Sequence, residues 1–193
     1  FDVPQNYRDD IGGTFYINEL NELREGLAKV VGRPITDDEI RTSIALYNEN
    51  RRRVEDLFTL RCQAPWKVPT SELYLVLRAG QVLPVEEFST LLSEYRDAVQ
   101  ADPSRQPMDQ ARVVVTGSFC EQPPLGLIRT LERSGCYIVE DDFVQVHRWI
   151  RGTVSEEGDP MGNLVRAFLE DGVESAIRYI GEKEKGAELV RRV

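Results

Sequence analysis

The first hundred residues carry apolar side chains at helical intervals. Between residues 14 and 32 they recur three to five positions apart, and Gly32 and Pro34 follow the last of them. Spacing of this kind predicts an amphipathic helix that ends at the glycine. The stripe consists of Phe15, Leu20, Leu23, Leu27 and Val30.

Residues 35–61 predict the clearest helix of the chain. Thr36 is followed three positions later by Glu39, which is the spacing of a capping box. Asp37 and Asp38 suit the positive end of a helix dipole. The expected buried side consists of Ile40, Ile44, Tyr47, Val54 and Leu57. The basic run 51–53 lies inside this pattern, which favours a solvated helix face over a binding site.

Two shorter helices are predicted before residue 101. Thr70 or Ser71 is expected to cap the first, which stops near Gly80. Pro84 opens the second and is followed by acidic residues, as is typical of a first helical turn. The segment 101–110 holds two prolines and mostly polar residues, so it is the best candidate for a linker.

Beyond this linker the apolar residues no longer recur only at helical spacing. "RVVVTG" is a short β-branched run that predicts a buried parallel strand. "PPLGLIRTLERSG" predicts a helix with one apolar face, stopped by Gly135, and "CYIVEDD" predicts a second strand. Together they form a βαβ unit, whose crossover should be right-handed. The remainder predicts two or three helices, broken at Gly172 and Gly181.

The fold class that follows is α/β. A helical N-terminal half, residues 1–100, precedes the linker 101–110 and a parallel βαβ lobe of Rossmann-like or flavodoxin-like type over residues 111–193. The chain starts without Met and ends inside a helical pattern. We therefore expect a piece of a longer polypeptide, in which the second domain is incomplete.

Two loops of the βαβ unit are candidate binding sites, because ligands of open α/β sheets sit at the carboxyl ends of the strands. They are the segments 117–122 and 140–142. The candidate substrate-binding residues are Ser118, Glu121, Gln122, Asp141 and Asp142. A terminal aspartate can instead cap the next helix or turn. The fingerprint GxGxxG is missing and prolines precede the helix, which disfavours a dinucleotide.

Cys120 stands in a polar loop just before a predicted helix N-terminus, where a thiolate is stabilised. The residues alone leave four alternatives open: an iron–sulfur ligand, a redox thiol, a substrate contact, or a small side chain that packs beside the sheet. Cys62 and Cys136 have no CxxC partner, so a self-contained zinc site is not expected. His147 has no acid or nucleophile at a recognisable catalytic spacing.

Composition narrows the class of protein. The 193 residues have a formal net charge of −9, which disfavours a nucleic-acid partner because phosphate binding needs clustered Lys and Arg. Three widely spaced cysteines suit reduced thiols, and hence a cytoplasmic protein. No apolar run reaches the ~20 residues of a membrane span.

Two segments together resemble a known family. "GRPITDDEIRTSIALYNENRRRVEDLFTLR", followed later by "RVVVTGSFCEQPPLGLIRTLERSGCYIVEDD" and "HRWIRG", is similar to the benzoyl-CoA reductase / 2-hydroxyacyl-CoA dehydratase family. The segments stand in the family's order and separation, and the combination of "LYNENRR" with "GSFCEQPP" is fairly specific. The chain looks like a middle piece of a D-component-like subunit.

The resemblance implies an oxidoreductase of anaerobic aromatic degradation, active only as the full-length assembly. Family members have two α/β lobes, and each subunit of a heterodimer of paralogous subunits can hold a [4Fe–4S] cluster in the cleft between its lobes. A separate ATP-hydrolysing activator supplies a low-potential electron, which reaches an acyl-CoA thioester and drives reductive dearomatisation or dehydration. The alternative is a module that binds an acyl-CoA or a partner subunit without redox chemistry.

The resemblance places Cys120 within the motif "GSFCEQPP" as a candidate cluster ligand. Most cluster cysteines of the family come from regions that are not recognisable here. We therefore expect this chain alone not to hold the cluster. Which acyl-CoA is the substrate, and whether it is reduced or dehydrated, stays open at this point.

Overall fold

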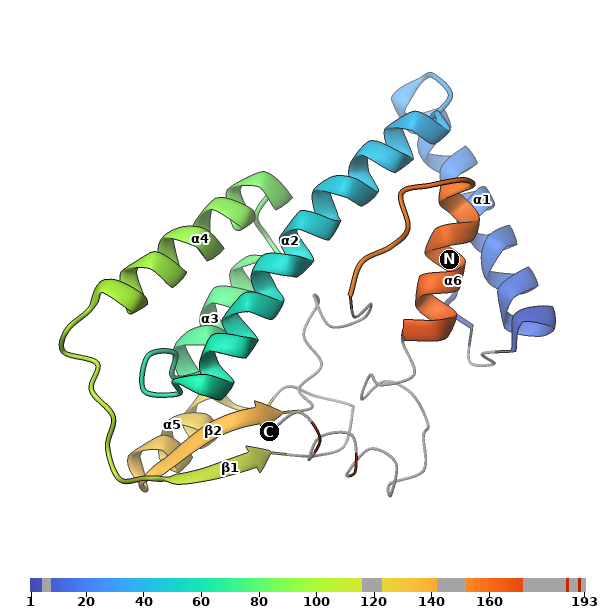
Figure 1. Ribbon diagram of the computed structural model, residues 1–193. Coiled ribbons are helices and arrows are strands. Elements are labelled where there is room, and N and C mark those ends of the chain that lie inside the picture. Colours follow the sequence, from blue (N-terminus) through green and yellow to red (C-terminus); the bar gives the residue numbers. More distant parts are fainter. Residues whose placement is uncertain (5–7, 116–122, 142–151, 172–186, 188–190, 192–193) are drawn as a thin grey trace. The chain divides into compact units, whose positions relative to one another are not determined.

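The computed structural model describes residues 1–4, 8–115, 123–141, 152–171, 187 and 191 (Figure 1). The chain divides into two compact units. The first unit comprises Phe1–Glu49 and Ile150–Val173, and the second comprises Asn50–Trp149 and Glu174–Val193. The long helix α2, Asp37–Gln63, begins in the first unit and ends in the second. None of the described helices is long and apolar enough to cross a membrane.

The first unit is built on a packed pair of helices. A short π-helical turn, η1 (Asp9–Gly13), leads into α1 (Thr14–Val31), and α6 (Pro160–Asp171) packs against them. The apolar contact between α1 and α6 is made by Tyr16, Ile17, Leu20, Val165, Phe168 and Leu169. The contact is close at Gly13, where an added Cβ would lie 3.2 Å from Cδ1 of Leu169.

Helix α1 confirms the predicted amphipathic helix, but its apolar side is only partly covered. Gly32 ends it with φ of 78°, and its N–H donates to the carbonyl of Ala28 at 2.9 Å. The stripe residues Phe15, Leu23, Leu27 and Val30 remain exposed. Leu20 alone of the stripe packs on the α6 cluster.

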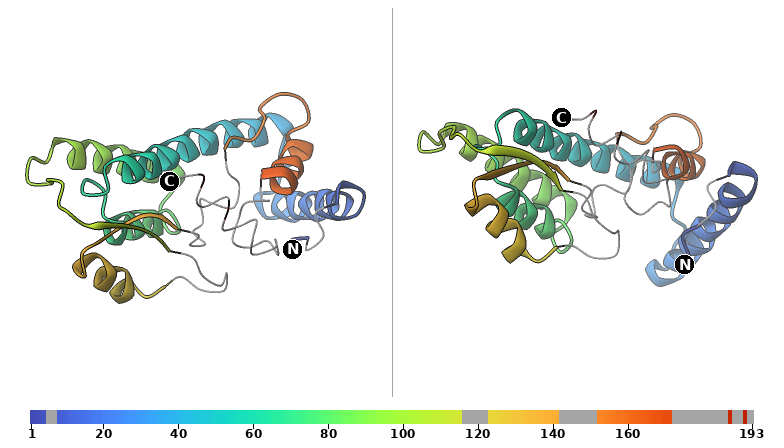
Figure 2. Two further views of the ribbon diagram at one scale, coloured as in Figure 1. Left: turned by 60° about the horizontal axis from the view of Figure 1, so that its bottom comes forward. Right: turned by 90° about the horizontal axis from the view of Figure 1, so that it is seen from below.

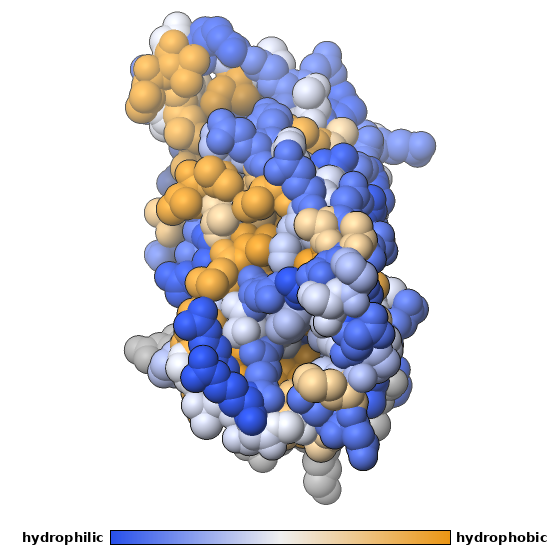
Figure 3. Space-filling view, turned by 90° about the vertical axis from the view of Figure 1, so that its left-hand side faces the viewer, coloured by the Kyte–Doolittle hydropathy of each residue, from blue (hydrophilic) through white to orange (hydrophobic). Residues whose placement is uncertain are grey.

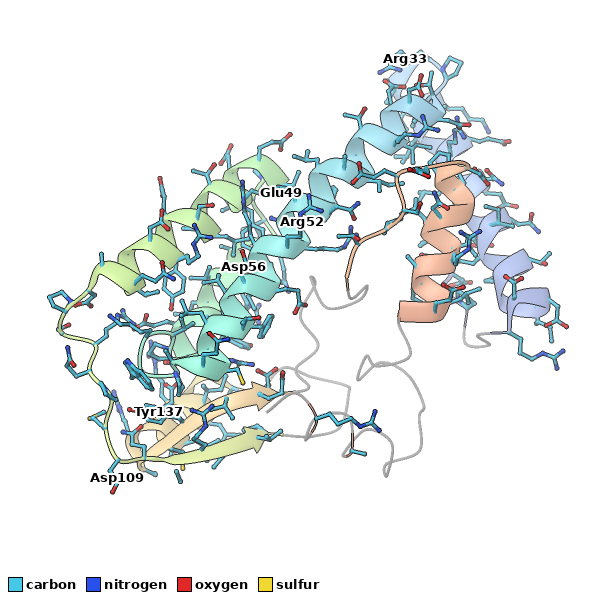
Figure 4. All side chains as sticks on the ribbon, in the orientation of Figure 1. Arg33, Glu49, Arg52, Asp56, Asp109 and Tyr137 are labelled. Carbon is cyan, nitrogen blue, oxygen red and sulfur yellow. The ribbon has the colours of Figure 1, made fainter. Side chains whose placement is uncertain are left out.

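Helix α2 begins with the predicted capping box. The Thr36 N–H donates to Glu39 Oε2 at 2.8 Å, and the Glu39 N–H donates to Thr36 Oγ1 at 3.3 Å. Arg33 also donates to this carboxylate, and Figure 4 shows it at the turn between α1 and α2. The expected buried side is confirmed at Ile44, Val54 and Leu57, and Ile40 is half-buried. The prediction that Tyr47 is buried is wrong, since this residue is 46% exposed.

The basic run in the middle of α2 is partly covered. Arg52 is exposed, whereas Arg51 and Arg53 are half-buried. Figure 4 shows Arg52 on α2 between Glu49 and Asp56. Arg52 therefore has acidic residues of the same helix on both sides.

Helices α3 (Thr70–Ala79) and α4 (Val85–Ala101) complete a helical core with the end of α2. Its buried residues are Val54, Leu57, Phe58, Val68, Leu73, Leu77, Phe88, Leu92 and Val99. Gly80 follows the last residue of α3, as predicted. The predicted side-chain cap is wrong: Pro69 is the N-cap of α3, and the Thr70 hydroxyl donates to the Ile138 carbonyl at 3.0 Å instead.

The predicted strand–helix–strand unit is confirmed. Strand β1 (Ala111–Val115), helix α5 (Leu125–Arg133) and strand β2 (Cys136–Asp141) follow one another, and the strands pair in parallel. Figure 2 shows α5 lying along the two strands. Ile128 of α5 is buried against Ile138. Gly135 joins α5 to β2 at φ of 87°.

The strand register is interrupted by a β-bulge. Val113 pairs with Ile138, but Val114 pairs with Glu140, so Val139 is an extra residue on β2. A bulge re-aims the side chains that follow it. Here the residues that follow it are Glu140 and Asp141, the last two residues of the strand.

Candidate functional site

The candidate site lies at the carboxyl ends of β1 and β2. Val115 and Asp141 pair at these ends, so the two segments that follow the strands leave the sheet at the same edge. Those segments, 116–122 and 142–151, lie outside the described residues. The roles of Ser118, Cys120, Glu121, Gln122 and Asp142 therefore stay predictions.

Asp141 is described, and it is buried in an ion pair. Its side chain is 4% exposed, and its Oδ2 lies 2.5 Å from Nη1 of Arg61. Glu140 stands beside it with Oε1 3.6 Å from Nη2 of Arg61. The same Glu140 oxygen accepts the backbone N–H of Asp141 at 2.9 Å. The carboxylate pair at the tip of β2 therefore meets one buried guanidinium.

Arg61 is placed by the last turns of α2. Its guanidinium stands over the Phe58 ring, with Cζ 4.8 Å from the ring centroid. Nη1 also donates to the Thr70 hydroxyl at 3.2 Å, and that hydroxyl donates to the carbonyl of Ile138. A continuous polar network therefore joins α2, the start of α3 and β2.

One buried guanidinium pairs with both carboxylates of this network. The side chain of Arg61 is 1% exposed. Nε and Nη2 of Arg61 are buried without a hydrogen-bond acceptor in the described part of the chain. Because removing one member would leave an uncompensated buried charge, the three residues are held together strongly. The network fixes the end of β2 at Asp141, the last described residue before position 142.

Arg61 was not predicted from the sequence, although a signal for it exists. It follows Leu57 by four positions and Phe58 by three, and both are buried. Helical spacing therefore places it on the buried face. A buried arginine requires a carboxylate partner, and the "EDD" at the end of the predicted second strand supplies candidates.

A cavity of about 590 Å³ opens at the opposite, amino edge of the strands. Cys136 and Tyr137 of β2 line it together with Trp66, whose ring centroid lies 6.4 Å from that of Tyr137. Figure 4 shows Tyr137 near the loop that carries Asp109. The size is that of a small-molecule pocket. No sequence pattern predicted this cavity.

The polar groups that line the amino-edge cavity are mostly engaged. Arg105 pairs with Glu72 at 2.9 Å and with Asp102 at 3.1 Å, and Glu132 accepts the Ser71 N–H at 3.0 Å. On the side of the molecule shown in Figure 3, hydrophobic patches lie among hydrophilic residues. The cavity itself is lined by aromatic residues such as Trp66 and Tyr137 together with these paired polar groups, which favours no single class of ligand.

A second cavity, of about 540 Å³, lies in the first unit between η1, α1 and α6. Asp9, Asp159, Arg166 and Glu170 contribute its charged groups. The Asp159 carboxylate is already used, because it accepts the N–H groups of Met161 and Gly162 at the start of α6. The acids here therefore serve helix capping at least in part.

The described cysteines do not form a metal site. Cys62 and Cys136 form no disulfide, and within the described residues no three His, Cys, Asp or Glu side chains gather in a way that could hold a metal ion. Cys136 opens β2 and Asp141 closes it, so this thiol stands at the far edge of the sheet from the candidate site.

Comparison with known proteins decides the family. All 193 residues match the family described as "2-hydroxyglutaryl-CoA dehydratase, D-component". The chain belongs to this family. The predicted resemblance to the reductase and dehydratase group is thereby confirmed.

Curated relatives of the D-component family include both kinds of enzyme subunit. The chain is 54% identical, over its whole length and 50% of the relative, to a benzoyl-CoA reductase subunit from Thauera aromatica. It is 30% identical to the beta subunit of lactoyl-CoA dehydratase from Anaerotignum propionicum, over 88% of the chain and 45% of that protein. It is 27% identical to the beta subunit of (R)-2-hydroxyglutaryl-CoA dehydratase from Acidaminococcus fermentans, over 72% of the chain and 36% of that protein.

The chain spans about half the length of the first two of these relatives. It therefore corresponds to a partial subunit within the D-component family. The network of Arg61, Glu140 and Asp141 lies at the carboxyl ends of the strands, where ligands of open α/β sheets sit.

Proposed function

We propose that this chain is part of a subunit of a benzoyl-CoA-reductase-type enzyme. The whole enzyme would act on an acyl-CoA thioester by low-potential electron transfer, in the cytoplasm, together with a paralogous partner subunit and an ATP-hydrolysing activator. The observation that carries the proposal is the 54% identity to a reductase subunit along the entire chain. The dehydratase subunits reach 30% or less, which favours reduction over dehydration.

The proposed substrate contacts come from the loops that follow β1 and β2. Ser118, Glu121, Gln122 and Asp142 would face the acyl-CoA. For Asp141 the buried ion pair with Arg61 supports a positioning role rather than a direct contact, because its carboxylate is already bound. The position of the loop after β2 would then depend on Arg61.

A [4Fe–4S] cluster is the cofactor that the proposal requires, and when bound it would supply the low-potential electron. The described residues do not by themselves fit such a cluster, because Cys62 and Cys136 belong to no group that could hold a metal. We assign Cys120 as this chain's candidate ligand. The other cysteines would have to come from the rest of the subunit.

The decisive experiment uses the full-length subunit, produced without oxygen together with its partner subunit and activator. With ATP and a reductant, benzoyl-CoA should lose its aromatic absorbance and give a dearomatised thioester by mass spectrometry. Conversion of a 2-hydroxyacyl-CoA instead, with benzoyl-CoA untouched, would assign the chain to the dehydratases. Binding of a CoA thioester by calorimetry with no turnover of either would support the non-redox module.

Cys120 is tested separately by its iron content. The variant Cys120→Ser should lower the iron and acid-labile sulfide bound per full-length subunit and abolish turnover. Cys136→Ser is the matched control, because this free thiol stands at the amino edge of the sheet and should retain both. Unchanged iron in Cys120→Ser would remove the ligand assignment.

A further inference from the structure

The hydroxyl of Thr70 is buried, and both of its hydrogen bonds reach other elements. The residue is 3% exposed, and although it opens α3, Pro69 is the N-cap of that helix. Nη1 of Arg61 donates to Thr70 Oγ1 at 3.2 Å, and Oγ1 donates to the carbonyl of Ile138 at 3.0 Å. A guanidinium can only donate and a carbonyl can only accept, so the direction of both bonds is fixed. The hydroxyl therefore bridges a side chain of α2 and the backbone of β2.

Arg61 depends on this bridge because few other groups hold its guanidinium. Both of its hydrogen bonds in the described part of the chain come from Nη1, one to Thr70 and one to Asp141 Oδ2 at 2.5 Å. Nε and Nη2 have no hydrogen-bond acceptor there, although Nη2 lies 3.6 Å from Oε1 of Glu140. The two hydrogens of Nη1 thus meet two acceptors, which orient the planar guanidinium.

The second bond of the Thr70 hydroxyl meets β2 directly before its bulge. Val113 pairs with Ile138 and Val139 is the extra residue, so the Ile138 carbonyl belongs to the last pair before the register changes. A bulge disrupts the ladder locally and re-aims the residues that follow it. Thr70 therefore holds the strand where the bulge begins, and it also holds the arginine that pairs with the carboxylates after the bulge.

We propose that Thr70 is a positioning residue of the candidate site. Its hydroxyl orients Arg61 against β2, and Arg61 in turn sets the carboxylates of Glu140 and Asp141 at the carboxyl end of the strand. The inference rests on the proposed function, in which an acyl-CoA thioester binds at this end of the sheet. Thr70 acts there only through Arg61 and the strand.

The test measures benzoyl-CoA reduction by the full-length subunit together with its partner subunit and activator. Thr70→Val keeps the shape of the side chain but removes the hydroxyl. The KM for benzoyl-CoA should rise at least about fivefold while kcat stays within about twofold, because a displaced strand end weakens binding of the substrate and of the transition state alike. Thr70→Ser keeps the hydroxyl, so its KM should stay within about twofold of the wild type.

Ser89→Ala is the matched control, because it also removes a buried hydroxyl from the second unit. Ser89 is 5% exposed on α4 and accepts a hydrogen bond from Asn50 Nδ2 at 2.9 Å. Within the described residues its hydroxyl has no hydrogen bond to Arg61 or β2. The variant should lose stability but keep the wild-type KM. Thr70→Ala is a second variant without the hydroxyl, and it should raise the KM as Thr70→Val does.

Hydrogen exchange gives a readout that needs no turnover. The Asp141 N–H donates to Glu140 Oε1 at 2.9 Å, so its exchange with deuterium reports on the end of β2. In the full-length subunit this amide should exchange at least about fivefold faster in Thr70→Val than in the wild type. Thr70→Ser and Ser89→Ala should exchange it at the wild-type rate.

Four outcomes overturn the proposal. They are a wild-type KM in both Thr70→Val and Thr70→Ala, an equal rise of KM in Ser89→Ala, a rise in Thr70→Ser as large as in Thr70→Val, and wild-type exchange at Asp141 in Thr70→Val. If the wild-type assembly reduces no benzoyl-CoA, the proposed function fails. The exchange of the Asp141 amide then decides by itself whether Thr70 positions this end of the strand.

Discussion

Arg61 and Asp141 are 80 positions apart in the chain and form a buried ion pair, with 2.5 Å between Nη1 and Oδ2. The pair joins the end of α2 to the last residue of β2. Glu140 adds a second carboxylate to the same guanidinium at 3.6 Å. The end of β2 is therefore fixed by a helix that stands much earlier in the chain.

Replacing Arg61 by Met should be strongly destabilising. The substitution keeps the apolar length of the side chain but removes the buried guanidinium that pairs with Asp141 and Glu140. We expect a loss of about 3–5 kcal/mol in the free energy of unfolding, the range for a broken buried ion pair. Urea unfolding followed by circular dichroism measures this loss.

The control for this prediction is Arg96→Met. Arg96 is 40% exposed and pairs with Asp97 at 3.2 Å and with Asp56 at 3.8 Å. Exposed pairs of this kind contribute about 0–1 kcal/mol, so the variant should stay within that range. Equal losses in the two variants would contradict the special role given to the buried network.

The elements of the fold could be predicted from local signals. The Thr36 and Glu39 capping box, the β-branched "RVVV" and the glycine at 135 each act over a few residues, and the structure contains all three. The prediction that the Thr70 side chain caps α3 was wrong, because its hydroxyl donates to a long-range partner, the Ile138 carbonyl. A local capping rule cannot weigh that competitor.

The candidate site could be predicted only in position. The rule that ligands sit at the carboxyl ends of parallel strands identified the edge where Glu140 and Asp141 stand. The sequence did not predict that one guanidinium, that of Arg61, would meet both carboxylates. The bulge at Val139 and the folding back of Glu140 onto the Asp141 N–H are tertiary features that no local pattern encodes.

Ile128 and Leu127 offer a sharp test of the packing of α5. Ile128 is 1% exposed in the cluster with Ile138 and Tyr74, whereas its neighbour Leu127 is 50% exposed. Ile128→Ala should cost about 2–5 kcal/mol, because it removes buried methyl groups and leaves a cavity. Leu127→Ala should change stability by less than about 0.5 kcal/mol. Chemical denaturation measures the free energy of unfolding of both variants. Similar losses of stability in the two would show that α5 packs differently.

Gly135 and Gly126 should respond to alanine in opposite directions. Gly135 has φ of 87°, where a Cβ costs about 1–2 kcal/mol, so Gly135→Ala should lower the melting temperature. Gly126 lies within α5, and an added Cβ there would meet nothing within 4 Å. Gly126→Ala should stabilise the chain by up to about 1 kcal/mol. A melting temperature for Gly135→Ala at or above the wild type would refute the left-handed turn.

The capping box of α2 should make stability depend on acid pH. Hydrogen bonds from Arg33 and from Thr36 lower the pKa of Glu39 to about 2. Because the folded-state pKa lies below the unfolded one, the ionised carboxylate stabilises the folded chain above about pH 5. This contribution is lost as the pH falls toward 2.

The variant Glu39→Gln isolates that charge, since glutamine can keep the capping geometry. Its stability deficit in urea should be largest near pH 7 and should shrink steadily between about pH 5 and pH 2. Glu87→Gln, in the first turn of α4, is the control, because Glu87 forms no ion pair within the described residues. A carbon-13 NMR titration of the Glu39 carboxyl should give a midpoint near 2. A midpoint above 4 would mean that Arg33 and Thr36 do not hold this carboxylate in solution.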